Sequence, residues 1–259
     1  MIYAITDTWY IVLRDLRTRM RMPVFIFMTM FQPILWMGIF PQIFKSVDVS
    51  AVSGPGADLS YLEFFAPGVV IMTVLFGSAF SGFGTLMDID AGIISKMLAT
   101  PVTRASIITG RVIATVMVGM IQACTIIIVA TIMGVHVETG VPGVFLVLFL
   151  AALLGMGFAA FSNGLALLLR RQETVMAVVN LFTMPLMFLS TMWMTSEQLP
   201  DWLNTARQFN PVDYAINGAR HLFLDGYIWS DLWKSLVVLG AWAIIGVIFG
   251  TLMFRRRAE

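Results

Sequence analysis

The sequence predicts an all-α membrane protein with six transmembrane helices, and three observations predict it. Of the 259 residues, 59% are hydrophobic and only 12% are charged, and the mean hydropathy is +0.88. Soluble domains contain roughly 45–50% apolar and about 25% charged residues. The apolar residues form long runs without the alternation of a transmembrane β-strand, and Lys and Arg gather between alternate runs.

Six apolar stretches are long enough to cross a bilayer, which takes about 20 residues of helix. The predicted spans are residues 24–44, 64–87, 112–133, 144–169, 175–193 and 236–254. Small residues four apart, such as Gly246 and Gly250, and amides such as Gln122 and Asn163 are expected to pack these helices together. Pore lining is the alternative for the amides. The sequence thus predicts a single transmembrane domain over residues 1–259.

The positive charges define the orientation, because Lys and Arg accumulate in cytoplasmic segments. Twelve of the 16 Lys and Arg residues fall on one side of the predicted spans, together with both termini. The other four are Lys45, Arg207, Arg220 and Lys234. The sequence therefore predicts a multi-pass protein of the cell membrane whose N- and C-termini are cytoplasmic.

Groups able to perform catalysis or hold a metal are scarce. Cys124 is the single cysteine, and the two histidines, His136 and His221, are far apart in the sequence. The sequence shows no internal repeat, which a secondary transporter commonly has, and no carboxylate deep in a span, which an ion pump usually needs. We expect no catalytic residue, no metal site and no enzymatic activity in this chain, and no binding of nucleic acid.

Residues 1–22 form a predicted amphipathic helix before the first span. Apolar residues recur at helical spacing between Ile2 and Met20, and most charged residues fall on other faces. Pro23 ends the pattern, because the residue before a proline disfavours the helical conformation. Such a basic helix with Trp and Tyr suits the inner-leaflet interface. It acts either as an anchor there or as a contact for a cytosolic partner, and the sequence leaves both open.

Segment 84–104 interrupts the apolar chain on the same side of the membrane. It predicts a short helix that Asp88 and Asp90 open, since carboxylates are favoured at helix N-termini, and that ends before Pro101. The apolar stripe of this helix consists of Ile93, Ile94, Met97 and Leu98. An exposed stripe needs a cover. Either the headgroup layer and the protein's own helix ends provide it, or a groove on a cytosolic partner does.

Segment 195–234, on the opposite side, mixes Trp, Tyr and Phe with charged residues. Pro200 begins a predicted short helix. Asn210 and Pro211 break the chain, and a second helix is predicted from Tyr214 onward. These features fit an extracytoplasmic re-entrant helical hairpin, whose irregular backbone must be buried in protein or face water. A soluble extracytoplasmic loop is the alternative.

Two motifs stand out in these segments: GTLMDIDAGIISKMLATPVTRASIITGR and LPDWLNTARQFNPVDYAINGARHLFLDG. Together with the topology, which covers nearly the whole chain, they resemble the permeases of ABC-2 type ABC transporters. That family includes daunorubicin-resistance-like permeases and polysaccharide or lipid exporters. The first motif is similar to the family's acidic loop ending in TPV-S/T-R, and the second to its LP-x-W-L … NP … Y … R segment. The family often has Glu where this chain has Asp88 or Asp90.

The resemblance implies a division of labour between subunits. A permease of this kind dimerises with a second copy or a homologue and works with two copies of a cytosolic ABC ATPase. It binds no cofactor itself, since MgATP binds to the ATPase, and this sequence contains no G-x-x-x-x-G-K-[ST] motif. The candidates for the ATPase contact are Asp88, Asp90, Ile94, Met97, Leu98, Pro101 and Arg104. The candidates for an extracellular gate are Pro200, Asn210, Pro211 and Tyr214.

The implied function is that of a permease subunit in an exporter driven by the partner's ATP hydrolysis. Its cargo would be a hydrophobic or amphipathic drug, a lipid, or a glycolipid or polysaccharide. Spans without charges favour such a cargo over a free ion. The alternative is a non-transporting membrane scaffold or sensor partnered with an ATPase. Membrane lipids surround the protein in either case.

Overall fold

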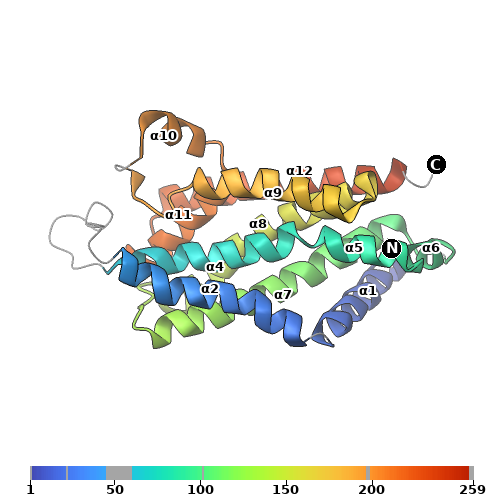
Figure 1. Ribbon diagram of the computed structural model, residues 1–259, viewed down its shortest axis with the longest axis horizontal. Coiled ribbons are helices and arrows are strands. Elements are labelled where there is room, and N and C mark those ends of the chain that lie inside the picture. Colours follow the sequence, from blue (N-terminus) through green and yellow to red (C-terminus); the bar gives the residue numbers. More distant parts are fainter. Residues whose placement is uncertain (1, 22, 45–59, 101, 197–198, 257–259) are drawn as a thin grey trace.

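The computed structural model describes residues 2–21, 23–44, 60–100, 102–196 and 199–256, where all regular elements are helices (Figure 1). In chain order they are α1 (Ile2–Met20), α2 (Pro23–Ile43), α4 (Tyr61–Ala79), α5 (Gly82–Asp90), α6 (Ile93–Leu98), α7 (Arg104–Ile132), α8 (Gly140–Leu169), α9 (Gln172–Phe188), α10 (Asp201–Arg207), α11 (Pro211–Leu224) and α12 (Trp229–Arg256). The predicted all-α class is confirmed for this part of the chain.

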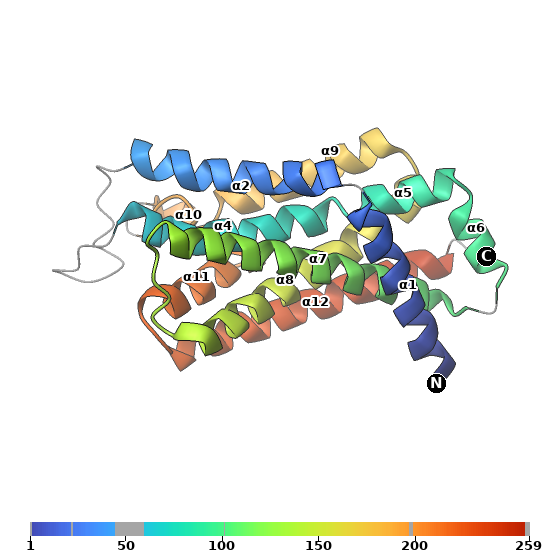
Figure 2. The same ribbon diagram turned by 90° about the horizontal axis from the view of Figure 1, so that it is seen from below.

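The long helices lie side by side along one axis (Figures 1 and 2). One end of the bundle carries α1, α5, α6 and the start of α7, and the described chain both begins and ends there. We call it the basic end, because it holds Arg14, Arg19, Lys96 and Arg111. The other end carries α10 and α11, and we call it the hairpin end.

Four helical stretches are long and apolar enough to cross a membrane. They are Tyr61–Asp90, Ala105–Ile132, Gly140–Leu169 and Trp229–Phe254. The other two predicted spans correspond to α2, of 21 residues, and α9, of 17. At 1.5 Å per residue α9 is about 26 Å long, a little less than the ~30 Å hydrocarbon layer. The chain is a multi-pass membrane protein with four candidate spans, and the count of six stays a prediction.

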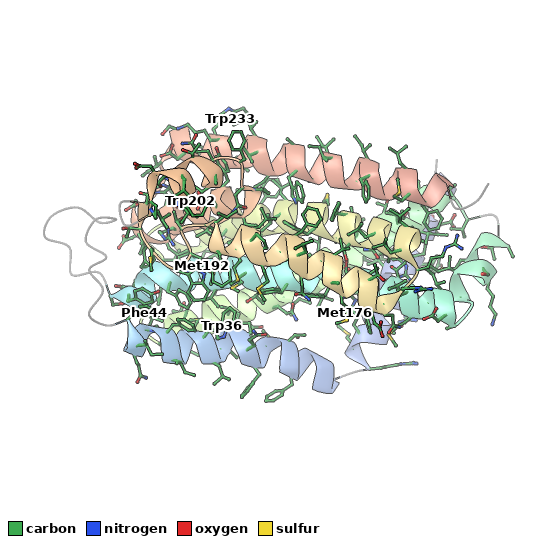
Figure 3. The ribbon with its side chains drawn as sticks, turned by 45° about the horizontal axis from the view of Figure 1, so that its top comes forward. Trp36, Phe44, Met176, Met192, Trp202 and Trp233 are labelled. Carbon is green, nitrogen blue, oxygen red and sulfur yellow. The ribbon has the colours of Figure 1, made fainter. Side chains whose placement is uncertain are left out.

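The outer surface of the bundle is apolar along its length, and exposed aromatic residues occur towards both ends. Trp202, Trp229 and Trp233 are exposed at the hairpin end, where Figure 3 shows two of them. Trp9 and Tyr10 are exposed at the basic end. Trp and Tyr are enriched where a membrane meets water, and the positions of these residues fit that pattern.

Helices α8 and α12 approach each other closely, and glycines make this approach possible. A Cβ added to Gly246 would collide with the backbone of Gly157, and one added to Gly250 would stand 2.7 Å from the carbonyl oxygen of Ala160. Phe158 and Trp242 pack beside this contact, with ring centroids 4.9 Å apart. The predicted close packing at Gly246 and Gly250 is confirmed.

The predicted span 64–87 is interrupted. Helix α4 ends at Ala79, and α5 starts at Gly82 and continues to Asp90. At this break the Gly82 N–H donates to Ser162 Oγ of α8 at 3.0 Å, and a Cβ at residue 82 would collide with the Ser162 backbone. The break therefore fits the chain against α8. Because α5 runs on to Asp90, Asp88 and Asp90 close a helix, and the prediction that they open the next one was wrong.

The predicted span 175–193 ends early, since α9 stops at Phe188. Asn210, from the hairpin end, explains where it stops. Its Nδ2 donates to the carbonyl oxygens of Leu186 and Leu189, at 2.6 and 3.0 Å, and so satisfies the end of α9. Its Oδ1 accepts from Val212 N at 2.9 Å and caps the start of α11.

Candidate partner-contact site at the basic end

Helix α1 docks across the start of α7. Ile11 is buried there, and a Cβ at Gly110 would stand only 2.8 Å from Ile11 Cγ2. Arg19 donates to Thr115 Oγ1 at 2.9 Å. Burial lowers the pKa of the Arg19 guanidinium from its ordinary value, and the nearby Asp15 carboxylate opposes this shift. Close packing at Gly110 and the hydrogen bond of Arg19 thus both contribute to holding α1 on α7.

The opposite face of α1 is exposed and largely apolar. It presents Ile5, Trp9, Tyr10 and Met20. A helix with one face against protein and another apolar face turned outward fits an interface position, where lipid or a partner covers the second face. The structure therefore keeps both interpretations of residues 1–22.

Helix α6 follows a tight turn. Gly92 has φ +68°, a left-handed conformation that glycine adopts without strain, and the chain turns there into Ile93–Leu98. Ile94 is only 2% exposed and packs in a cluster with Ile11 and Ile107. Met97 is half-buried against the same cluster. The protein itself covers this part of the predicted stripe.

Asp88 is the centre of the charge arrangement at the basic end. Its two carboxylate oxygens each accept from Arg14 NH2 of α1 at 2.9 Å. Asp88 Oδ2 also pairs with Arg111 NH2 of α7. One carboxylate at the end of α5 therefore links two arginines from two other helices.

The arrangement continues into the bundle through hydroxyl and amide groups. Arg111 NH1 donates to Thr85 Oγ1 at 2.8 Å, and the Thr85 hydroxyl donates to Asn163 Oδ1 of α8. Asn163 Nδ2 donates to Ser81 Oγ at 3.1 Å, beside the α4–α5 break. A continuous polar chain thus runs from α1 through α5 and α7 to α8. The expectation that Asn163 packs helices together is confirmed.

An open groove of about 500 Å³ lies between α1 and α6. Its lining residues are Asp7, Tyr10, Ile11, Arg14, Ile93, Lys96, Met97, Thr100 and Val102. Tyr10 and Lys96 are exposed, one on each side. The groove combines an apolar floor with both charge signs, so it can receive an amphipathic element of another protein.

The structure separates the predicted ATPase-contact residues. Met97 lines the groove and Asp90 is exposed, so both are accessible to a partner. Ile94 is buried within the chain. Asp88 is engaged by two arginines. In this conformation Ile94 and Asp88 contact other parts of the chain and are not available to a partner.

Three further predicted contact residues lie wholly or partly outside the described part of the chain. Leu98 ends α6, but its side chain and that of Arg104 lie outside the described residues, as does Pro101 altogether. Sequence reasoning missed Arg14 and Arg111 as partners of Asp88. The available signal was the concentration of arginines on the side of the membrane that holds Asp88.

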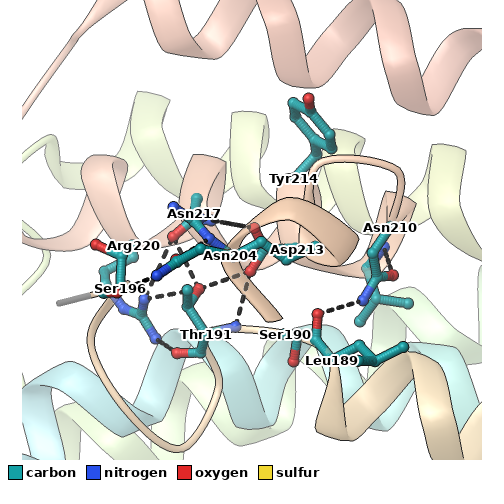
Figure 4. A network of polar contacts seen from close by, with 12 residues as sticks. Leu189, Ser190, Thr191, Ser196, Asn204, Asn210, Asp213, Tyr214, Asn217 and Arg220 are labelled. Carbon is teal, nitrogen blue, oxygen red and sulfur yellow. Dashed lines mark hydrogen bonds and ion pairs between the residues drawn. The ribbon is translucent and has the colours of Figure 1, made fainter. Parts of the chain in front are cut away.

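A second polar network ties the hairpin end together (Figure 4). Asp213 Oδ1 accepts from the Thr191 N–H at 2.7 Å and from its hydroxyl at 2.8 Å. Asp213 Oδ2 accepts from Arg207 at 3.1 Å and from Asn217 at 2.9 Å. These bonds join the turn after α9 to α10 and α11.

Arg220 of α11 fixes the same turn to α4. Its NH2 donates to the Thr191 carbonyl at 2.8 Å and its Nε to the Phe64 carbonyl at 3.3 Å. The guanidinium carbon lies 3.9 Å from the centre of the Phe64 ring, a cation–π contact. Burial lowers the pKa of Arg220 to about 10 against the opposing effect of Asp213. The side chain therefore keeps its charge at neutral pH.

The predicted gate residues occupy different positions in this network. Pro200 is exposed at the start of α10. Asn210 and Pro211 are buried where α11 begins. Tyr214 points away from the polar network in Figure 4, and its carbonyl accepts from Ser235 of α12 at 2.9 Å. Their role as a gate stays a prediction.

The fold so far defines a multi-pass helical membrane protein with an open groove at its basic end. The profile of the ABC-2 type transporter family matches residues 6–224. The chain belongs to the ABC-2 type transporter family, whose permeases are transmembrane subunits without an ATPase domain. Membership implies a partnership with an ATPase subunit, as the two motifs indicated.

Several curated proteins resemble this chain. A putative transport permease, ycf38, of Cyanophora paradoxa is 27% identical over 245 residues, which cover 91% of this chain and 83% of that protein. The daunorubicin resistance ABC transporter permease protein DrrB1 of Streptomyces coeruleorubidus is 22% identical over 219 residues, covering 84% and 76%. The probable multidrug ABC transporter permease YbhR of Escherichia coli K12 is 23% identical over 186 residues, covering 70% and 50%.

Proposed function

We propose that this chain is the permease subunit of an exporter that moves a hydrophobic or amphipathic substrate out of the cytoplasm. ATP hydrolysis in a separate cytosolic ATPase, which binds MgATP, drives the transport. Two permease chains, identical or homologous, assemble with two ATPase copies. Family membership and the absence of a P-loop motif from this sequence support the division of labour.

The groove between α1 and α6 is the observation that carries the proposal. Arginines concentrate at the basic end, which favours a cytosolic position for it. An apolar element of the ATPase would lie in the groove against Tyr10 and Met97, with Lys96 pairing an acidic group at its rim. Movement of the ATPase would then act on α1 and α6 together.

Movement at the basic end would open or close the path by rocking the permease halves as rigid bodies. The tight α8–α12 pair supports rigid-body behaviour. The α10–α11 hairpin would lie on the extracytoplasmic side as a re-entrant element and form the gate. Exposed tryptophans at that end support an interfacial position.

The cargo class we favour is a hydrophobic drug-like molecule. Two of the relatives are named for daunorubicin resistance and for multidrug transport. The four candidate spans are strongly apolar, which suits a hydrophobic cargo. Lipids and glycolipids or polysaccharides are the competing cargoes.

Introducing negative charge at the groove tests the ATPase contact. Lys96→Glu combined with Tyr10→Glu should abolish co-purification with the partner ATPase, because both side chains are exposed on the groove. Lys234→Glu is the matched control, since Lys234 is an exposed lysine at the hairpin end. Full ATPase recovery by the groove variant would refute the contact.

Transport is tested separately with inverted vesicles. ATP-dependent uptake of a fluorescent hydrophobic cation or anthracycline should require both this chain and its ATPase. A complex that hydrolyses ATP but moves no drug, lipid or glycan would instead support the scaffold or sensor alternative.

A further inference from the structure

We propose that Arg111 is a positioning residue. It holds Asp88, and through it the arm formed by α5 and α6, against the transmembrane bundle, whereas Arg14 joins α1 to the same carboxylate as a separable contact. The inference rests on the proposed function for its biological meaning, but the contacts that carry it belong to this chain alone.

The first step is the difference in burial between the two arginines. The Arg111 side chain is 6% exposed, the Asp88 side chain 17% and the Arg14 side chain 31%. An ion pair screened by water contributes little, whereas breaking a buried pair leaves an uncompensated charge in a poorly polarisable environment. Asp88 is therefore bound more durably to Arg111 than to Arg14.

The second step is what each arginine retains when Asp88 leaves. Arg14 NH1 lies 3.7 Å from Asp15 on its own helix and 3.7 Å from the sulfur of Met97. Arg14 can therefore pair with the Asp15 carboxylate when Asp88 leaves. Arg111 is fixed through Thr85 to the buried amide of Asn163. Its planar guanidinium contacts the hydroxyl and the carboxylate with different nitrogens, which fixes its direction.

The third step is where these contacts meet. Gly110, on which α1 rests, directly precedes Arg111 in α7. Displacement of α1 from this glycine would open the partly exposed Arg14 pair first. The buried Arg111 pair would keep α5 and α6 on the bundle. The two elements that line the groove thus have separate attachments to one carboxylate.

Amide hydrogen exchange on the purified permease in nanodiscs tests this order. Arg14→Gln should speed exchange in residues 8–20 by about fivefold or more and leave residues 86–98 within about twofold of the parent protein. Arg111→Gln should speed exchange in residues 86–98 by about tenfold. Arg17→Gln, at an exposed arginine of the same helix, is the matched control and should change neither segment.

Two outcomes would overturn the proposal: unchanged exchange in residues 86–98 in Arg111→Gln, or an equal increase there in Arg14→Gln. Arg111→Lys, which keeps the charge, should restore part of the protection, and exchange as fast as in Arg111→Gln would count against the role. If Arg111→Gln cannot be recovered, Thr85→Val removes only the supporting hydroxyl. Thr85→Val must then speed hydrogen exchange more in residues 86–98 than in residues 8–20, or the proposal fails.

The assembled complex supplies a second readout. Arg111→Lys and Thr85→Val should still bind the ATPase, because neither residue lines the groove, but should lower efflux relative to ATP hydrolysed. An unchanged ratio in both would refute the positioning role. Exchange is measured without the ATPase, so a failure of the groove contact would sink the proposed function and leave this inference standing.

Discussion

The two ends of the bundle are each built around a buried arginine beside an aspartate, but the arginines are held in different ways. At the basic end, Arg111 is held by side chains, a hydroxyl and the carboxylate of Asp88. At the hairpin end, Arg220 donates to the backbone carbonyls of Thr191 and Phe64 and lies on the Phe64 ring. At the basic end the hydrogen bond and the ion pair of the arginine are with side chains, whereas at the hairpin end the arginine binds backbone carbonyls as well as side chains.

The difference indicates which end can move. Side-chain ion pairs can exchange partners while the helices keep their backbone hydrogen bonds. The Thr191 carbonyl in the turn after α9 accepts from Arg220, and losing this donor would leave a buried polar group unsatisfied. The hairpin end is therefore expected to be rigid and the basic end adjustable, and four substitutions test this contrast.

Arg220→Met should have the largest effect. It removes the donor of two buried carbonyls and the cation beside Asp213, and we expect about 3–5 kcal/mol of destabilisation. The measurement is thermal unfolding in detergent, with recovery as a monodisperse protein. Arg207→Met, at a partly exposed partner of Asp213, should cost about 1 kcal/mol or less. Equal losses would contradict a special role for the backbone contacts.

Asp88→Asn should rank second, at about 3 kcal/mol, because it leaves the buried Arg111 without its counter-charge. Asp90→Asn changes an exposed residue two positions away and should stay within about 0.5 kcal/mol. The same unfolding assay compares them. Similar melting temperatures for the two variants would show that the ion pair at the basic end contributes nothing.

Gly110→Ala should be third, at about 1–3 kcal/mol, because the new methyl group meets Ile11 and lifts α1 from α7. Gly84→Ala is the matched control. Nothing lies within 4 Å of its added Cβ, and removing a helical glycine should stabilise by up to about 1 kcal/mol. Faster proteolysis of α1 in Gly110→Ala alone would localise the effect, and identical behaviour of both variants would refute it.

The long helices could be predicted from sequence because a span must be continuous, apolar and about 20 residues long. Their interruptions could not. The break before Gly82 depends on a close approach to Ser162, which lies 80 residues later in the chain. The end of α9 depends on Asn210, and an Asn–Pro pair indicates a helix start without naming the second helix that it caps.

The candidate site shows the same limit. Helical spacing correctly predicted an apolar stripe that includes Ile94, but periodicity does not say what covers a stripe. Here Ile11 and Ile107 cover Ile94 from α1 and α7. Charge counting placed arginines and Asp88 on one side of the membrane. The selection of Arg14 and Arg111 as partners required the fold, since they come from two different helices.

Asn210→Ala should have the smallest effect of the four, about 1–2 kcal/mol, but it sharpens the contrast most directly. The cap of α11 accounts for about 1 kcal/mol, and the rest comes from the α9 carbonyls that lose their donor. Asn210→Asp keeps the acceptor for Val212 N and loses the donor to α9. If the hairpin end is rigid because the Asn210 side chain caps both the end of α9 and the start of α11, Asn210→Asp should restore only the stability that comes from the α11 cap. Hydrogen exchange should then stay fast at the end of α9 and become slow again at the start of α11, and full rescue by Asp would show that the α9 contact contributes nothing.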